Sequence, residues 1–251
     1  MPASDRILLV TGGSRGIGAA TCRLAARQGY VVAVNYHRNI AAASAVVAGI
    51  QREGGRALAV QGDVAREDEI VRVFATIDEQ LGRLTHLVNN AGITGLAGRI
   101  DGVDSATLRS VLDLNAYGAF LCAREAVRRI STKHGGRGGA IVSLSSAAAT
   151  LGSPGEFVWY AASKAAVDAM TLGLAREVAA EGIRVNAVAP GLIDTDIHDD
   201  AGIPGRLARL APSVPLARAA TPEEVAETIL FLLSDAASYV TGAVLRVAGG
   251  R

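Results

Sequence analysis

The sequence predicts an α/β fold, in which a doubly wound sheet of seven parallel strands is covered by helices on both faces. Short apolar runs alternate with helical patterns along the chain, and no internal repeat is present. Glycine or polar residues follow most of the apolar runs directly. Alternating strands and helices favour parallel pairing through right-handed crossovers, so these residues are expected to gather at one edge of the sheet.

Each predicted strand is a short, continuous apolar run, which is typical of a strand that is buried on both faces. We expect the seven strands over residues 6–10, 31–35, 57–60, 87–88, 140–144, 184–188 and 243–247. Helical periodicity predicts helices over residues 17–28, 40–53, 67–80 and 106–132. A further helix contains Tyr160 and ends at about Glu181, and Thr221 is expected to cap the last helix. Residues 93–104 are expected to form a loop, and residues 192–217, which lack clean periodicity, a mobile flap over the site.

Length and composition suit one chain-long domain, residues 1–251, with half of the residues hydrophobic. The 25 Lys and Arg against 24 Asp and Glu leave no basic field that would attract nucleic acid. No apolar run reaches the roughly 18 residues of a membrane span, and the first strand begins too early for a signal peptide. The two cysteines, Cys22 and Cys122, are expected to be buried and unpaired, which fits a reducing cytoplasm.

A glycine-rich turn follows the first strand at residues 12–18 (GGSRGIG) and leads into a helix. Glycines there let the turn close, and they let backbone amides approach a pyrophosphate at the helix N-terminus. The glycine spacing differs from that of the commoner dinucleotide fingerprint, and any turn between a strand and a helix can collect glycines. The position of this turn, after the first strand and before a helix, favours a dinucleotide site.

The second strand ends without the acidic residue that would bind an adenosine ribose 2'-hydroxyl. Tyr36, His37 and Arg38 stand there, and Arg38 together with Arg15 of the glycine turn could bind a 2'-phosphate. Alternatively, Arg38 only begins the next helix in solvent. Asp63, after the third strand, could accept a hydrogen bond from an adenine amino group, or it could only cap the helix that follows.

Tyr160 and Lys164 are spaced so that they share one face of a helix, about one turn apart. A nearby ammonium favours the phenolate form of a tyrosine, and general acid–base catalysis needs a group tuned in this way. By itself the pair fits a packed tyrosine and a solvated lysine better than a catalytic pair, because short motifs often match by chance. Asn115 lies inside a predicted helix, where asparagine is a poor helix former, so its side chain is expected to have specific partners.

Taken together, these motifs resemble the classical short-chain dehydrogenase/reductase family. The resemblance is carried by residues 11–18 (TGGSRGIG), residues 89–92 (NNAG), Asn115, Ser146, Tyr160 with Lys164, and Pro190 with Gly191. It extends over residues 6–250 and implies a Rossmann-like domain that binds NAD(P). No single motif is specific, but the set is.

The resemblance also implies roles for the candidate catalytic residues Asn115, Ser146, Tyr160 and Lys164. Tyr160 would exchange a proton with the substrate oxygen, which Ser146 would hold by a hydrogen bond. Lys164 would bind the nicotinamide ribose and lower the pKa of Tyr160, and Asn115 would hold a water that links Lys164 to solvent. Ser146 precedes Tyr160 by one residue more than is frequent in the family, so Ser145 is the alternative.

The resemblance further implies the residues that contact the cofactor and the substrate. The expected cofactor-binding residues are Gly12, Ser14, Arg15, Gly16, Ile17, Gly18, Tyr36, His37, Arg38, Asp63, Val64, Asn90, Ala91, Gly92, Tyr160, Lys164, Pro190, Gly191, Ile193 and Thr195. The expected substrate-binding residues are Ser146, Trp159, Tyr160, Ile197 and His198, with Trp159 in one wall of the pocket. No metal site is expected, because the four histidines are scattered without ligand spacing.

The expected function is NADP(H)-dependent interconversion of a small carbonyl compound and its secondary alcohol, with NAD(H) also possible. Glu156, Asp196 and His198 favour a hydroxylated substrate such as a sugar or polyol. One alternative is a 3-oxoacyl-[acyl-carrier-protein] reductase, although Glu181 stands where carrier-dependent relatives often have a basic residue. Another is a dinucleotide-binding regulator that does no chemistry. A homotetramer is expected, because the helices over residues 106–132 and around Tyr160 carry many small apolar residues.

Overall fold

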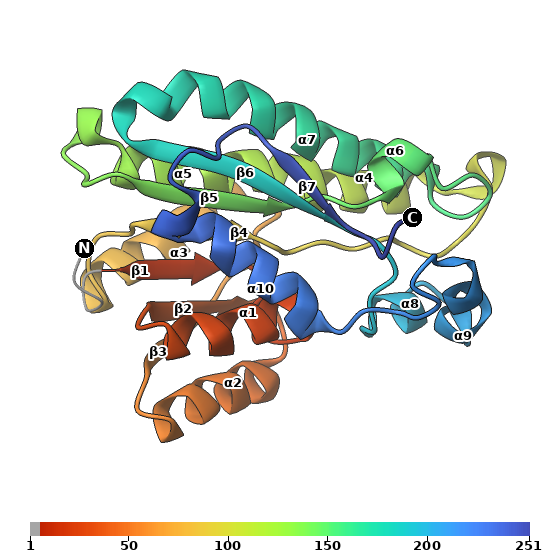
Figure 1. Cartoon of the computed structure of the whole chain (residues 1–251), viewed down its shortest axis with the longest axis horizontal. Coiled ribbons are helices and arrows are strands. Elements are labelled where there is room, and N and C mark those ends of the chain that lie inside the picture. The colour runs from red at the N-terminus through yellow and green to blue at the C-terminus, as the bar shows by residue number, and fades with distance from the viewer. Residues whose placement is uncertain (1–5) are drawn as a thin grey trace.

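The computed structural model of the chain describes residues 6–251 and contains one seven-stranded sheet, in which all strand pairs are parallel (Figure 1). The strand order is β3-β2-β1-β4-β5-β6-β7. The strands are β1 (Ile7–Val10), β2 (Val31–Tyr36), β3 (Arg56–Gln61), β4 (His86–Asn89), β5 (Gly139–Leu144), β6 (Ile183–Pro190) and β7 (Val244–Val247). The predicted fold class is confirmed, while residues 1–5 of the expected domain lie outside the described residues. The strand order reverses between β1 and β4, where sheets of this kind bind ligands.

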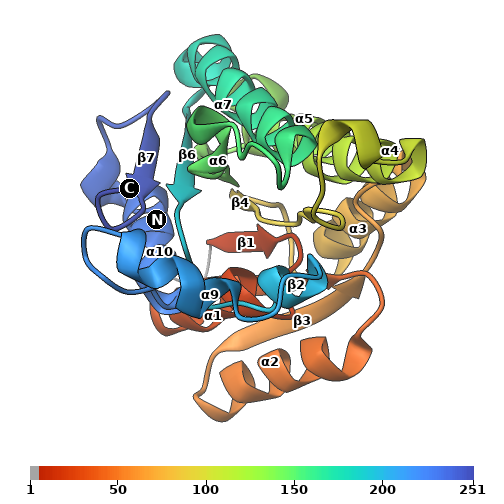
Figure 2. The same cartoon turned by 90° about the vertical axis from the view of Figure 1, so that its right-hand side faces the viewer.

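Helices cover both faces of the sheet, as Figure 2 shows. One face carries α1 (Gly16–Arg27), α2 (Ile40–Arg52) and α10 (Pro222–Leu233), and the other carries α3 (Glu67–Gln80), α5 (Ala119–Ile130) and α7 (Val158–Val178). Successive strand residues point to opposite faces, so Leu8 packs into the first core and Leu9 into the second. Cys22 and Cys122 are buried and free in these separate cores, which confirms their predicted state.

The helix expected over residues 106–132 is interrupted in the structure. It consists of α4 (Ser105–Leu112), a π-helical segment at Asp113–Gly118, and α5. The π segment contains Asn115, whose side chain bonds to the chain after β4, and Gly118, which lies against the Val64 carbonyl group. These tertiary contacts widen the helix at this point. Such π-helical turns often occur at functional sites.

The flap segment, which we define as residues 192–217, contains two short helices that the sequence does not predict. These are α8 (Ile197–Asp200) and α9 (Arg206–Leu210), and a bridge between Ile193 and Ala220 fixes the start of the segment. A further short helix, α6 (Ala148–Leu151), follows β5. Thr221 caps α10 as expected, because its hydroxyl accepts a hydrogen bond from the Glu224 amide. No helix in residues 6–251 is long and apolar enough to cross a membrane.

Gly118→Ala is expected to lower the free energy of unfolding by about 1–3 kcal/mol, as overpacking typically does. A methyl group at Gly118 would overlap the carbonyl oxygen of Val64, which is backbone and cannot turn aside. Chemical denaturation measures the change. Gly49→Ala in α2 is the matched control, because the nearest atom there is the far end of Arg52, and alanine should stabilise that helix slightly. A Gly118 variant as stable as the wild-type protein would contradict this packing.

Candidate active site

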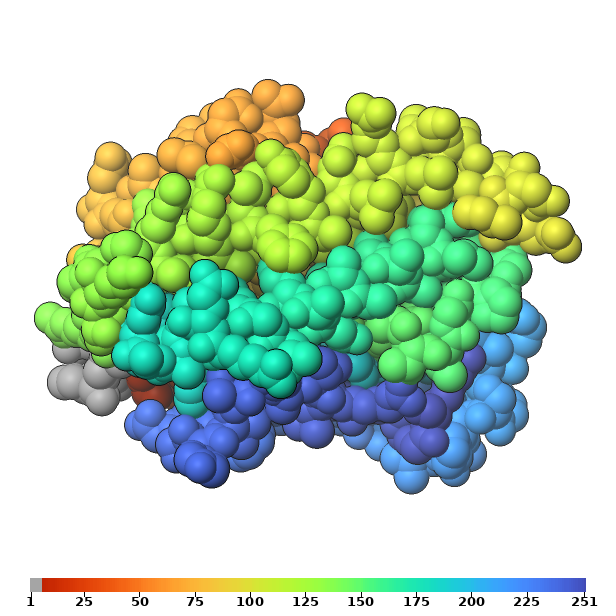
Figure 3. All heavy atoms as spheres, turned by 90° about the horizontal axis from the view of Figure 1, so that it is seen from above, coloured from red at the N-terminus to blue at the C-terminus, as the bar shows by residue number. Residues whose placement is uncertain are grey.

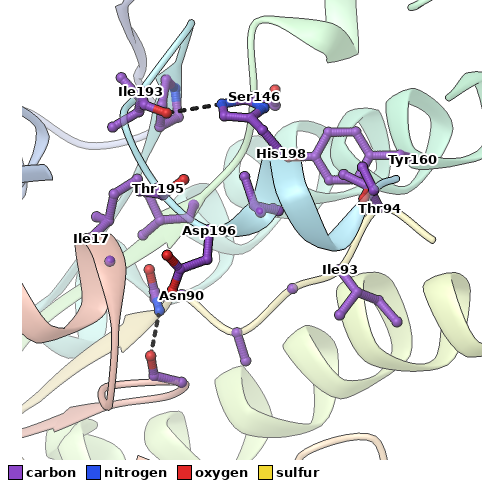
Figure 4. A pocket seen from close by; sticks show the side chains of 18 of the residues that line it. Ile17, Asn90, Ile93, Thr94, Ser146, Tyr160, Ile193, Thr195, Asp196 and His198 are labelled. Carbon is purple, nitrogen blue, oxygen red and sulfur yellow. Dashed lines mark hydrogen bonds between the residues drawn. The ribbon is translucent and has the colours of Figure 1, made fainter. Parts of the chain in front are cut away.

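A cavity of about 1100 Å³ runs along the carboxyl ends of the strands, across the point where β1 and β4 meet. Its walls come from the glycine turn, the ends of β2, β4 and β5, the start of α7 and the flap segment. Figure 4 shows Ile17, Asn90 and Thr195 toward one side of this cavity, and Ser146 and Tyr160 toward the other. The cavity therefore joins the two groups of motifs that the sequence analysis identified.

The glycine turn is held in place by side chains from the neighbouring strands. The Gly12 amide donates a hydrogen bond to Oδ1 of Asn35 (3.2 Å), and Nδ2 of Asn90 donates to the carbonyl oxygens of Thr11 (2.8 Å) and Gly12 (3.1 Å). A Cβ atom at Gly18 would lie 2.6 Å from Nδ2 of Asn90. Gly18 thus lies behind the cavity wall, and its lack of a side chain lets α1 approach the turn. The open turn at the helix N-terminus fits a pyrophosphate.

At the end of the cavity beside β2, Arg38 is exposed and forms no ion pair with any carboxylate of residues 6–251. His37 instead lies 3.7 Å from Asp63, measured from Nε2 to Oδ2. Oδ1 of Asp63 accepts a hydrogen bond from the Ala65 amide at the start of the following turn. Arg38 is therefore a cation at the cavity wall that remains available to an anionic ligand.

Arg15, the second arginine expected at a 2'-phosphate, is already paired in the structure. Its guanidinium lies 2.6 Å from Asp200 and 3.6 Å from Asp196, both in the flap segment. Arg15 therefore connects the glycine turn to α8 across the cavity, an arrangement that the sequence did not predict. Of the two candidate arginines, only Arg38 is free of carboxylate partners.

At the other end of the cavity, the Ser146 side chain lies close enough to Tyr160 to affect its pKa through hydrogen bonding. Oγ of Ser145 faces away and donates to the backbone carbonyl of Lys164 (3.4 Å). The serine hydroxyl that meets Tyr160 is thus that of Ser146, the first of the two alternatives left by the sequence. Burial raises the pKa of Tyr160, and the hydrogen bond with Ser146 and the positive charge of Arg206 oppose that shift.

Lys164 lies beneath Tyr160, with Nζ 5.7 Å from the centre of the tyrosine ring. Nζ donates a hydrogen bond of 2.6 Å to the Leu144 carbonyl at the end of β5. Burial lowers the pKa of Lys164 from 10.5 to about 8, and the carboxylate of Asp168 opposes this shift. The lowering of the Tyr160 pKa by Lys164, which the resemblance implied, is not found, because burial of the phenol dominates.

Asn115 does not line the cavity but supports it from behind. Its Oδ1 accepts from the Ile93 amide (2.9 Å), and its Nδ2 donates to the Ile93 carbonyl (2.8 Å) and to Oγ of Ser163 (3.0 Å). A Cβ atom at Gly92 would lie 3.2 Å from Oδ1 of Asn115 and 3.3 Å from Nζ of Lys164. The glycine therefore makes the space that Lys164 occupies, and Asn115 positions the chain around it.

All the predicted site residues line the cavity except Gly18, Asn115 and Trp159. The expectation that Trp159 forms a pocket wall is therefore corrected. Trp159 is 4% exposed, and its Nε1 donates to the Thr94 carbonyl (2.7 Å). Neighbouring residues of a helix point about 100° apart, so Trp159 and Tyr160 cannot both face the cavity. Phe157 lines the wall instead, with its ring centre 6.4 Å from that of Tyr160.

The polar groups on which a sugar-like substrate was expected are engaged by other protein groups. Glu156 pairs with Arg206 of the flap segment (2.7 Å). Asp196 pairs with Arg15, and Nε2 of His198 lies 2.9 Å from the Ile193 carbonyl, as the dashed line in Figure 4 marks. Sequence reasoning missed Arg206, because nothing in the irregular flap sequence indicates that this arginine turns inward.

Chemically, the cavity can hold an extended dinucleotide and can place a protonated hydroxyl group next to a small oxygen-bearing ligand. The open glycine turn and the unpaired Arg38 fit the phosphate groups of a dinucleotide. The hydroxyl groups of Ser146 and Tyr160 can bind the same ligand oxygen. Residues 6–251 contain no group of three or more His, Cys, Asp or Glu side chains that could hold a metal ion.

Comparison with known proteins identifies the family. The family model described as Enoyl-(Acyl carrier protein) reductase matches residues 12–251. The uncharacterized oxidoreductase YgfF of Escherichia coli (strain K12) is 51% identical over 245 residues, which cover 98% of this chain and 99% of that protein. A 3-oxoacyl-[acyl-carrier-protein] reductase of Synechocystis sp. is 43% identical over 253 residues, which cover 98% of this chain and 96% of that protein.

A solved structure agrees with these sequence comparisons. The crystal structure of a dehydrogenase/reductase from Sinorhizobium meliloti 1021 has a TM-score of 0.88 and 34% identity to this chain, and the match covers 98% of this chain and 94% of that one. Because the matches span nearly the whole sequence and the fold, this chain is an NAD(P)-dependent oxidoreductase that belongs to the classical short-chain dehydrogenase/reductase family.

Proposed function

We propose that this oxidoreductase prefers NADP(H) and interconverts a small carbonyl compound with its secondary alcohol. The observation that carries the proposal is the contact of Ser146 with Tyr160, above the buried Lys164, at one end of a cavity. The other end of the same cavity carries Arg38, a cation without a carboxylate partner. A dinucleotide that lies along the cavity would bring these two ends into one reaction.

The chain's own residues supply binding and proton transfer. When bound, NADP(H) supplies the hydride, or accepts it in the reverse direction. Ser146 binds the substrate oxygen by a hydrogen bond and holds it beside the Tyr160 hydroxyl. Tyr160 gives its proton to that oxygen during reduction and takes it back during oxidation. Lys164, beneath the Tyr160 ring, would bind the nicotinamide ribose, and Asn115 acts by positioning, or through a water that would link Lys164 to solvent.

Reduction of 3-oxoacyl groups on an acyl carrier protein is a second candidate function, because the Synechocystis relative carries that name. A carrier protein is acidic and needs a free basic surface. Arg128 and Arg129 at the end of α5 both pair with the buried Glu125, at 2.8 and 3.0 Å, and Arg129 also pairs with Asp78 (2.7 Å). These arginines are therefore not a free basic patch, which favours a small substrate.

We further propose a homotetramer in which α4, α5 and α7 pair between subunits. These helices form the face seen in Figure 3, and exposed apolar side chains lie on them or on the π segment, namely Leu112, Tyr117, Phe120 and Leu172. Apolar side chains that cluster on one face mark interaction surfaces.

We also propose one domain over residues 1–251, with residues 192–217 as a movable flap. The buried, free cysteines fit a cytoplasmic location.

Tyr160→Phe is expected to keep the fold and the cofactor affinity but to lose on the order of 100-fold or more in kcat, because the proton donor is removed. Loss of NADPH absorbance with a panel of small ketones measures turnover. Tyr239→Phe, which removes a hydroxyl from a fully exposed tyrosine, is the control. Turnover near the wild-type level in the Tyr160 variant would contradict the mechanism, and absence of turnover in the wild-type protein would favour a non-catalytic regulator.

Arg38→Gln is expected to weaken NADPH binding on the order of 10- to 100-fold, because a hydrogen bond to a charged group is worth about 1.5–3 kcal/mol. The affinity for NADH should change little, since NADH lacks the 2'-phosphate. Fluorescence titration with each reduced cofactor gives both dissociation constants. Arg23→Gln, an exposed arginine of α1 outside the cavity, is the control. A wild-type protein that binds NADH more tightly would refute the preference.

Lys164 should make stability depend on alkaline pH. Its pKa falls from 10.5 in the unfolded chain to about 8 in the fold, so the unfolded chain binds more protons between these values. The free energy of unfolding therefore rises as the pH increases through this window, by about 3 kcal/mol relative to Lys164→Met. Denaturant titrations of both proteins across the window measure the difference. A difference that stayed constant with pH would mean that the pKa of Lys164 is not lowered in the folded protein.

A further inference from the structure

The feature that the mechanism leaves unexplained is an inward-facing arginine in the flap segment. Arg206 lines the cavity beside Glu156, Phe157 and Tyr160, and only 12% of its side chain is exposed. Arg209, one turn further along α9, pairs with the same glutamate but is 59% exposed and does not line the cavity. The two arginines therefore share a partner but differ in their access to the reaction space.

The Arg206 guanidinium is only partly satisfied by the protein. It has five N–H donors. Nη2 donates to Oε2 of Glu156 (2.7 Å), and Nη1 lies 3.2 Å from Nδ1 of His198. Nε is buried and has no hydrogen-bond partner in the described part of the chain. A buried cation with donors to spare is costly unless an acceptor completes its bonding. Nε is therefore out of a ligand's reach, and the donors that a ligand in the cavity can meet are the remaining N–H groups of Nη1 and Nη2.

Arg206 lies close to the reacting hydroxyl group. Its Cζ is 5.6 Å from the centre of the Phe157 ring, which in turn makes an edge-to-face contact with the Tyr160 ring. Its positive charge also lowers the pKa of Tyr160, against the effect of burial. A ligand group bound at Arg206 would therefore lie within the length of one small molecule from the oxygen that Tyr160 protonates.

The charged groups in contact with Arg206 do not cancel all the positive charge of the cluster, because one carboxylate, Glu156, is shared by two arginines. Burial lowers the pKa of His198, so the imidazole is neutral at pH 7 and its Nδ1 can accept from Arg206. Asp196 is engaged by Arg15, and neither Asp194 nor Asp199 lines the cavity. Glu156 is the remaining carboxylate in contact, and it is shared with Arg209.

We propose that Arg206 is a specificity-determining residue, which selects substrates that carry a carboxylate a few bonds away from the reacting carbonyl or carbinol carbon. Guanidinium groups bind carboxylates through paired, charge-assisted hydrogen bonds, and a partly buried one does so with little competition from water. Arg206 already lines the cavity in this conformation, so any movement of the flap segment would also move the group that binds the carboxylate. This inference rests on the proposed function, because it assigns the substrate class of the same site.

The test compares matched acids and amides on matched variants. NADPH-dependent reduction of acetoacetate and levulinate is measured against acetoacetamide and levulinamide, with wild-type protein, Arg206→Gln and Arg209→Gln. A second readout is calorimetric titration of the NADP-bound proteins with pentanoate and pentanamide, which does not require turnover. Arg206→Gln should lower kcat/KM for the oxo acids, and the affinity for pentanoate, on the order of 10- to 100-fold. Values for the amides should change far less, because the amides lose only the influence of the Arg206 charge on Tyr160, and Arg209→Gln should behave like the wild-type protein.

Three outcomes would overturn the inference. One is an Arg206 variant that retains the wild-type preference for acids over amides. Another is a parallel loss for acids and amides, which would assign Arg206 only to holding the flap segment in place. A third is an equal loss in both arginine variants, which would trace the effect to Glu156. If the amides are reduced but no acid is preferred, the proposed function stands without this inference. If no ketone is reduced, the proposed function fails, and the pentanoate titration alone decides the role of Arg206.

Discussion

The hydrogen bonds of a single buried amide determine how the parts of the active site fit together. Asn115 binds both backbone groups of Ile93 and the hydroxyl of Ser163, which in turn donates to the backbone carbonyl of Tyr160 (2.7 Å). One side chain therefore ties the chain after β4 to the interrupted helix and to α7. An asparagine amide offers one acceptor oxygen and two donor hydrogens, and here all of these are engaged. The space around Lys164 exists because these three segments are held at fixed distances.

The burial of the active-site lysine and tyrosine lowers the folding stability of the protein. Lys164 is a buried cation that donates to the carbonyl group of Leu144 and to no other acceptor within residues 6–251, and its pKa is strongly lowered by burial. Tyr160 is shifted in the opposite direction by the same lack of water. Burial disfavours charge on either group: it brings the Lys164 pKa toward neutral pH, where proton exchange is most effective, but it makes the Tyr160 phenol a weaker acid. The surrounding sheet, with apolar residues on both faces, supplies the stability that this arrangement costs.

The sequence was informative wherever a local rule determines the structure. Continuous apolar runs predicted the strands, and the glycine turn and the spacing of Tyr160 and Lys164 follow from helix and turn geometry. The π segment could not be predicted, because it arises from contacts of Gly118 and Asn115 with chain segments distant in sequence. The prediction that Trp159 lines the cavity was wrong, because adjacent residues of a helix point to different faces. The inward turn of Arg206 left no sequence signal, since the segment around it has no period.

The pairing of Arg15 with α8 has a consequence for how the protein responds to its cofactor. The same guanidinium lies at the edge of the adenosine region and is bound by Asp200 and Asp196 of the flap segment. A phosphate group that draws Arg15 toward itself weakens these ion pairs, and by reciprocity an open flap segment leaves Arg15 free for phosphate. The ion pairs are exposed to solvent, so dissolved salt screens them. Under the proposed flap movement and NADP(H) preference, ionic strength would therefore act on both through one shared charge.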